Sequence, residues 1–160
     1  MQTPAHRTQA TTAGMLLGLG LGGFVDGIVL HQILQWHHML SNWLPPTTMA
    51  AMHRNMVWDG LFHACVWLVT LLGVVLLWRA AYQQETMPAL GAFIGQLLFG
   101  WGLFNLVEGS IDHQILGVHS VRQVPNYTVY TLTFLAVGGV GLLLVGWLLM
   151  QTRRRDVIEL

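Results

Sequence analysis

Four apolar stretches, each long enough to cross a membrane as a helix, divide the sequence. They run near residues 14–34, 57–78, 89–112 and 127–150. A hydrocarbon core of roughly 30 Å takes about 20 helical residues to cross, and a helix satisfies its own backbone hydrogen bonds where lipid offers no partner. The sequence therefore predicts an all-α integral membrane protein, a four-helix bundle in which residues 1–160 form a single transmembrane domain.

The composition agrees with a bilayer environment. Apolar residues make up 54% of the chain and charged residues 9%, the formal net charge is zero, and the chain contains no lysine. This balance is typical of membrane proteins and leaves no basic surface large enough to attract nucleic acid. The only cysteine, Cys65, can form no intrachain disulfide. The lipid bilayer is thus the expected partner, and nucleic-acid binding is excluded.

A polar motif occurs twice, 82 residues apart, where the first and third apolar stretches end. The two copies read Asp26-Gly27-x-x-x-His31-Gln32-Ile33-Leu34-x-x-His37 and Glu108-Gly109-x-x-x-His113-Gln114-Ile115-Leu116-x-x-His119. From them we predict an internal repeat of two helical hairpins, covering about residues 14–80 and 88–151. Because each hairpin crosses the membrane twice, both enter it in the same direction. A pseudo-two-fold axis along the membrane normal would then relate them.

The motifs and the second apolar stretch place ionisable side chains where lipid penalises them. Burying one such charge costs roughly 3 kcal/mol on insertion scales, and residues of this kind generally face the bundle interior and mark function. Neutral imidazoles with carboxylates suit iron, zinc, copper or manganese, which helix bundles bind through inward Glu, Asp and His side chains. The predicted ligands of a transition metal ion are His31, His63 and His113. The further candidates, as ligands or as acceptors that orient the imidazoles, are Asp26, Asp59, Glu108, His37, His119 and Asp112.

The spacing within each motif raises a geometric difficulty. On a regular helix, at 100° per residue, Asp26 and His31 point about 140° apart, so both cannot face one ion directly. Either the site has two layers, or a local bulge near Gly27 and Gly109 rotates one group inward. The sequence leaves both alternatives open.

The two halves are not equivalent around this site. Aligning Asn55 with Asn126 sets Tyr130 in the fourth helix against Asp59 in the second, and Phe134 against His63. A symmetric scaffold with an asymmetric ligand set would leave one side of the metal open, as catalytic and transfer sites require.

Interpretations without a metal fit the same residues. The acids and histidines could form a polar network that fixes helix register without an ion. His37, His38 and His119, near the outer interface, could equally be solvated surface residues.

Three functions follow from these alternatives. The first is a metal-binding membrane protein that serves redox chemistry or delivers metal to a partner such as a respiratory complex. The second is a protein binding b-type haem, with His31, His113 or His63 as axial ligands. The third is a proton- or ion-coupled transporter with Asp26 and Glu108 as its relay, which with four helices would require a homodimer. Catalytic residues stay unknown; oxidoreductase-like metal chemistry is the class expected of any enzymatic activity.

Arginine positions predict the orientation in the membrane. The termini and the central loop share one side of a four-span protein, and they hold five of the seven arginines. By the positive-inside rule both termini are cytoplasmic. The chain is then a multi-pass protein of the bacterial cytoplasmic (inner) membrane, and both motifs lie toward its outer face.

The motif strings resemble those of a bacterial family of four-helix membrane proteins of unknown function. The resemblance covers most of the chain and is carried by Gly23-Phe24-Val25-Asp26-Gly27-Ile28, His31-Gln32, Leu34-Gln35-Trp36-His37-His38, Trp58-Asp59-Gly60-Leu61-Phe62-His63, Glu108-Gly109, Asp112-His113 and His119. It implies a four-helix membrane fold. It also implies a link to genes for cytochrome oxidase assembly, which would favour copper or haem handling and a partner in a respiratory complex.

Overall fold

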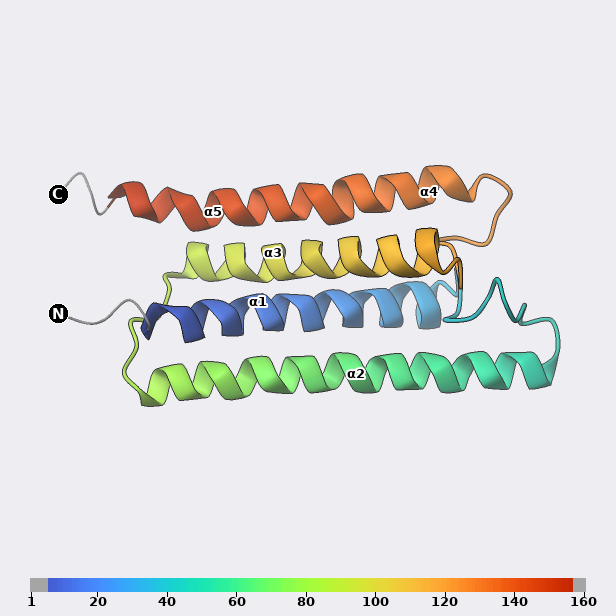
Figure 1. The fold of residues 1–160 in the computed structure, drawn as a ribbon, viewed down its shortest axis with the longest axis horizontal. Helices are drawn as coiled ribbons and strands as arrows, with labels where there is room; N and C mark the ends of the chain where they lie inside the picture. Colours follow the sequence, from blue (N-terminus) through green and yellow to red (C-terminus); the bar gives the residue numbers. More distant parts are fainter. Residues whose placement is uncertain (1–5, 157–160) are drawn as a thin grey trace.

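The structure is a computed structural model that describes residues 6–156, and in this range every regular element is a helix (Figure 1). Its elements are α1 (His6–Val25), η1 (Asp26–Ile33), α2 (Met49–Tyr82), α3 (Leu90–Glu108), η2 (Gly109–Ile115), α4 (Tyr127–Thr133), η3 (Phe134–Gly141) and α5 (Leu142–Asp156), where η marks a π-helix. Joined end to end, they form four rods that are long and apolar enough to cross a membrane. The predicted four-helix membrane fold is confirmed.

The four rods lie side by side in the order α2, α1, α3 and α4–α5 (Figure 1). The inner helices α1 and α3 pack on each other, α2 packs on α1, and the last rod packs on α3. Both termini and the short link between α2 and α3 lie at one end of the molecule (Figure 1). The loops of residues 34–48 and 116–126 lie at the opposite end, which we call the loop end.

The inner pair is held at close range by glycines. A Cβ added at Gly18 would collide with the backbone carbonyl of Leu97, and one added at Gly100 would collide with that of Met15. Small residues at such positions let helix backbones touch in a membrane. The contacts are reciprocal, because Gly100 lies 82 residues after Gly18 and Leu97 lies 82 residues after Met15. Equivalent positions of the predicted repeat therefore contact each other.

The outward surfaces of the rods are apolar. Large side chains such as Leu72 on α2 and Val137 on η3 are 50% and 66% exposed. Trp43 and Trp58 are exposed toward the loop end, and Trp78 and Trp147 toward the other end. Exposed Leu and Val between two levels of tryptophan are the pattern of a surface that faces lipid and its two interfaces.

Helix α2 begins earlier than the sequence predicted. The expected stretch of residues 57–78 was placed by hydropathy, whereas α2 begins at Met49, where the Thr48 side chain accepts a hydrogen bond from the Ala51 amide. At about 1.5 Å per residue, a helix of 34 residues is longer than the hydrocarbon core is thick. A helix can continue through polar residues outside the hydrocarbon core. Hydropathy therefore predicts the membrane-spanning part of α2 but not the residue at which the helix begins.

The glycine contacts of the inner pair predict a specific loss of stability. Gly100→Ala drives a methyl group into the Met15 carbonyl, and overpacking of this kind typically costs about 1–3 kcal/mol. Thermal unfolding in mild detergent, followed by circular dichroism, should show a lower midpoint. Gly91→Ala is the matched control, because a Cβ at Gly91 meets nothing within 4 Å; an equal midpoint for the two variants would contradict this packing.

Candidate metal centre

Each motif copy lies in a π-helical segment, η1 or η2, and this resolves the difficulty of its spacing. The amide of Leu34 donates to the carbonyl of Val29, and that of Leu116 to Ile111, both at 2.8 Å and both spanning five residues. A π-helix brings residues five apart onto neighbouring turns. Of the two alternatives left open by the sequence, the structure adopts the local bulge.

The bulge brings the acid and the first histidine of each motif together. His31 Nε2 lies 3.2 Å from Asp26 Oδ2, and His113 Nε2 lies 3.0 Å from Glu108 Oε1. Gly27 is the second residue of η1 and Gly109 the first of η2, and neighbouring helices leave no room for a side chain at either position. A Cβ at Gly27 would collide with His63, and one at Gly109 with Leu135.

Three buried imidazoles have their Nδ1 atoms fixed by acceptors outside the cluster. Nδ1 of His31 donates to Asp59 Oδ1 at 3.0 Å, that of His37 to the Val121 carbonyl at 2.9 Å, and that of His119 to the Met39 carbonyl at 3.1 Å. A carbonyl or ionised carboxylate can only accept, so Nδ1 carries the proton. In the neutral ring, Nε2 is then a bare lone pair. Histidine ligands of metals are oriented in this way.

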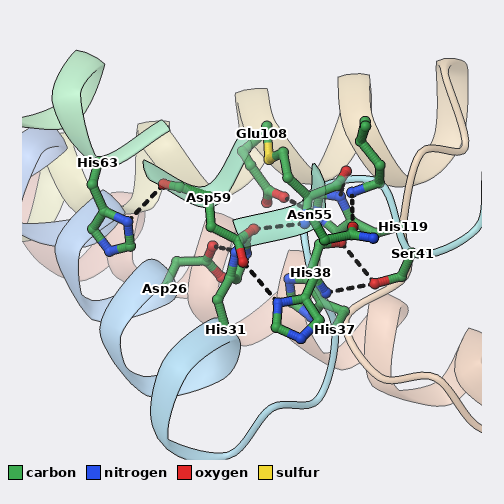
Figure 2. A network of polar contacts seen from close by, with 12 residues as sticks. Asp26, His31, His37, His38, Ser41, Asn55, Asp59, His63, Glu108 and His119 are labelled. Atoms are coloured by element: carbon green, nitrogen blue, oxygen red, sulfur yellow. Dashed lines mark hydrogen bonds and ion pairs between the residues drawn. The ribbon is translucent and has the colours of Figure 1, made fainter. Parts of the chain in front are cut away.

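These three histidines converge at the centre of the loop end (Figure 2). One ligand atom of each of His31, His37 and His119 lies within 4.8 Å of the others. The rings of His37 and His119 stack at 4.4 Å between centroids, with an interplanar angle of 7°. All three side chains are almost fully buried. Burial to this degree excludes the interpretation of His37 and His119 as solvated interface residues.

A second group adjoins the first and shares one of its members. Glu108, His113 and His119 also offer ligand atoms within 4.8 Å of one another. His119 Nε2 lies 3.0 Å from Glu108 Oε1, although its Nδ1 already donates to Met39. A bare lone pair then faces a carboxylate oxygen. Two acceptors at this distance repel each other unless an additional proton or a cation lies between them.

Asp59 holds the first loop over this centre. Its carboxylate accepts from His31 Nδ1, from His38 Nδ1 at 2.7 Å and from the Met39 amide at 2.8 Å. Three donors satisfy an ionised carboxylate that is 1% exposed. Asp59 therefore acts as an acceptor that orients His31, one of the two roles predicted for it.

Asn55 fixes the same loop one turn earlier on α2 (Figure 2). Its Oδ1 accepts from the Leu40 amide at 3.0 Å, and its Nδ2 donates to the Leu44 carbonyl at 2.8 Å. Sequence reasoning missed this role, and missed His38 and Ser41, which form a local turn. A signal did exist for Asn55, because it precedes Asp59 and His63 at intervals of four residues, which places all three on one helix face.

Four of the predicted residues lie outside both ligand groups. Asp26 and Asp59 contact His31, whereas His63 and Asp112 contact none of the grouped side chains through an ion pair or hydrogen bond of the described residues. His63 donates from Nδ1 to the Asp59 carbonyl at 2.7 Å and lies apart from the other histidines (Figure 2). Asp112 is half-buried, and its backbone carbonyl accepts from the Val118 amide. The structure thus brings together Asp26, His31, His37, Glu108, His113 and His119, with Asp59 behind His31.

His37 and His119 are the members of the cluster that lie in loops outside the spans. Burial, followed by the neighbouring His119 and His31, holds the pKa of His37 well below its usual value. Its imidazole is therefore neutral at pH 7, which is the form that binds metals. A cavity of about 560 Å³ at the loop end is lined by His37 and His38, so it reaches the edge of the cluster.

Residues 13–153 match a known family, described as "Predicted membrane protein (DUF2243)". The chain belongs to this family. No curated protein and no solved structure matches the chain. The family match agrees with the four apolar rods and covers both motif copies, so the buried cluster lies within the region that the family shares.

The chemistry open to this family member follows from its donor set. Three oriented imidazoles, a fourth imidazole and two carboxylates form a mixed nitrogen and oxygen set, which suits first-row transition metals. They are buried among apolar helices, where unpaired charges are costly. A bound cation would compensate the two carboxylates, Asp26 and Glu108, without requiring protons.

Removal of the Asn55 side chain should release the first loop. In Asn55→Ala the Leu40 amide and Leu44 carbonyl lose their partner, a loss of roughly 1–3 kcal/mol. Hydrogen exchange by mass spectrometry should then be faster in peptides that cover residues 38–44. His53→Ala, an exposed position on the same helix, should leave this exchange unchanged. Exchange as slow as in the wild type would show that Asn55 does not hold the loop.

Proposed function

We propose that this chain is a membrane protein that binds one transition metal ion in its histidine and carboxylate cluster. The observation that carries the proposal is the common orientation of His31, His37 and His119. Each donates its Nδ1 proton away from the cluster and turns Nε2 toward it. Nε2 of His31 and of His119 lies 3.2 and 3.0 Å from the carboxylates of Asp26 and Glu108, and Nε2 of His37 has no hydrogen-bond partner. A network that only fixed helix register would pair this buried nitrogen of His37 with a donor, since an unpaired buried acceptor is costly.

One ion is expected because the two ligand groups share His119. Its Nδ1 is engaged by the Met39 carbonyl, so Nε2, which lies 3.0 Å from Glu108 Oε1, is the one nitrogen left for a metal, and one nitrogen lone pair binds one metal. The pairs Asp26 with Glu108, His31 with His113, and His37 with His119 are each 82 residues apart. The ion would therefore lie near the pseudo-two-fold axis that we propose between the hairpins.

The donor set narrows the metal to iron, zinc, copper or manganese. Met49 and Met56 on α2 are 86% and 60% exposed, so neither contributes a soft thioether ligand to the buried cluster. Redox chemistry, or delivery of the metal to a partner such as a respiratory complex, is the role that an accessible site of this kind would serve. The cavity beside His37 at the loop end is the side from which we expect the site to be reached.

A b-type haem is less compatible with the same residues. Axial histidines need a flat space around them for the porphyrin. Here the ring of His37 lies 4.4 Å from the rings of both His31 and His119, between centroids. The imidazoles fill the centre that a porphyrin would occupy.

Metal content is the test of the proposal. Protein purified in mild detergent, without chelator or histidine tag, should carry about one transition metal ion per chain by plasma mass spectrometry. His119→Ala removes the ligand that both groups share, so metal content should fall to background. His63→Ala is the matched control, a histidine at the same end of the molecule and outside both groups, and it should retain the ion.

Other results would contradict specific parts of this proposal. If wild-type protein stays free of metal after exposure to copper, zinc, iron and manganese, the cluster is a polar network without an ion. Two ions per chain would contradict the sharing of His119. Iron with an intense Soret band would show a haem. Loss of the ion in His63→Ala would return His63 to the ligand set.

The orientation that we propose places both termini in the cytoplasm of a bacterium and the metal centre toward the outer side of the inner membrane. Five of seven arginines belong to the termini and the central loop. A fluorescent protein fused after residue 160 should therefore fluoresce, because it folds in the cytoplasm, and alkaline phosphatase at the same place should be inactive. The opposite pair of results would reverse the orientation.

A further inference from the structure

Arg122 is a cation without an acidic partner. It lies in the loop between η2 and α4, half-buried, and among the described residues no carboxylate forms an ion pair with it. Its guanidinium carbon lies 5.1 Å from the ring centroid of Trp36 and 5.0 Å from that of Tyr130. Nη1 donates to the Tyr130 hydroxyl at 2.7 Å. The cation is therefore held in place by aromatic faces and one hydrogen bond.

This arginine lines a cavity of about 370 Å³ at the loop end. The walls include His113, Ser120 and Tyr127, and no acidic residue contributes to them. The side chain of His113 is 2% exposed, and its Nδ1 has no hydrogen-bond partner. A fixed cation, hydroxyl groups and the side chain of His113 thus line one space next to the cluster.

We propose that this cavity binds a small oxyanion, such as a carboxylate or bicarbonate, on Arg122 and beside His113. A guanidinium presents five N–H donors in a planar fork that matches the two oxygens of a carboxylate. Tyr130 takes one of them, so donors remain for a ligand. As far as it concerns the metal, this inference rests on the proposed function: the anion would approach the ion from the side of His113.

The arrangement is better suited to a ligand than to packing alone. If Arg122 served only to hold Trp36 against Tyr130, a carboxylate partner in its loop would stabilise the guanidinium further. The described part of the chain supplies no such partner. The opposite half of the site is built differently, because there Asp59 satisfies His31 and His38. The half that contains His113, whose Nδ1 has no hydrogen-bond partner, also contains Arg122, which has no acidic partner among the described residues.

Binding of carbon-13-labelled formate, followed by the width of its NMR signal in detergent solution, tests this site. Metal-free wild-type protein should broaden the signal, and unlabelled bicarbonate should reverse the broadening by competition. Arg122→Gln should weaken formate binding about tenfold or more, because it removes charge-assisted hydrogen bonds. Arg54→Gln is the matched control, an exposed arginine at the same end, and should bind formate as the wild type does.

Two further arms keep the outcome decisive. Arg122→Lys retains the charge over the aromatic rings but not the planar fork, so it should bind formate more weakly than wild type while unfolding at a similar temperature. Protein loaded with paramagnetic copper(II) should relax the formate carbon faster than protein loaded with zinc, because the anion lies beside the ion.

Each failure has a distinct meaning. No broadening by the metal-free wild type, or equal binding by Arg122→Gln, would overturn the anion site. Formate binding without faster relaxation in copper-loaded protein would overturn its position beside the metal. If no metal can be loaded, the proposed function fails, while the metal-free comparison of Arg122→Gln with Arg54→Gln still decides the anion site.

Discussion

Lipid offers no hydrogen-bond partner, and this constraint decides which side chains of the chain face inward. Leucine, valine and tryptophan cover the rods, whereas Asp26, Asn55 and Asp59 are at most 4% exposed. The inner contact of α1 with α3 is made by glycine against backbone. Because the helices gain little from burying apolar side chains against one another in a bilayer, close backbone contact and satisfied polar groups must hold the assembly. The polar cluster is therefore part of what fixes the arrangement of the helices.

The π-helical segments show how the chain meets two demands at once. An α-helix would satisfy its backbone but would turn Asp26 and His31 to different faces. Widening one turn keeps the backbone hydrogen-bonded over five residues and brings acid and histidine together. The same device recurs at Glu108 and His113. Such bulges are frequent at functional sites, and their presence in both motif copies links the local distortion to the cluster itself.

The sequence predicted the fold well because the bilayer reduces the choices to a few. Apolar length gave four spans, and the structure has four helical rods that are long and apolar enough to cross a membrane. The site was predicted in part. Composition identified the acids and histidines, but it could not show that His63 turns away while His37 and His119 meet, since that depends on loops 34–48 and 116–126 folding back over the helices. Loop paths follow from long-range contacts such as Asn55 with Leu40 and Leu44, which leave no periodic pattern in the sequence.

The two halves hold their matching histidines differently, so the two sides of the centre are not equivalent. His31 is held by Asp59, and this acid has no equivalent in the second half, where Tyr130 occupies the aligned position and accepts from Arg122. His113, the counterpart of His31, consequently has an Nδ1 without a partner. Of two otherwise matched imidazoles, one is fixed by a charge-assisted hydrogen bond and the other is held only by packing and Glu108. An ion bound at this centre would keep His31 as a rigid ligand, and any exchange of ligands would begin on the side of His113.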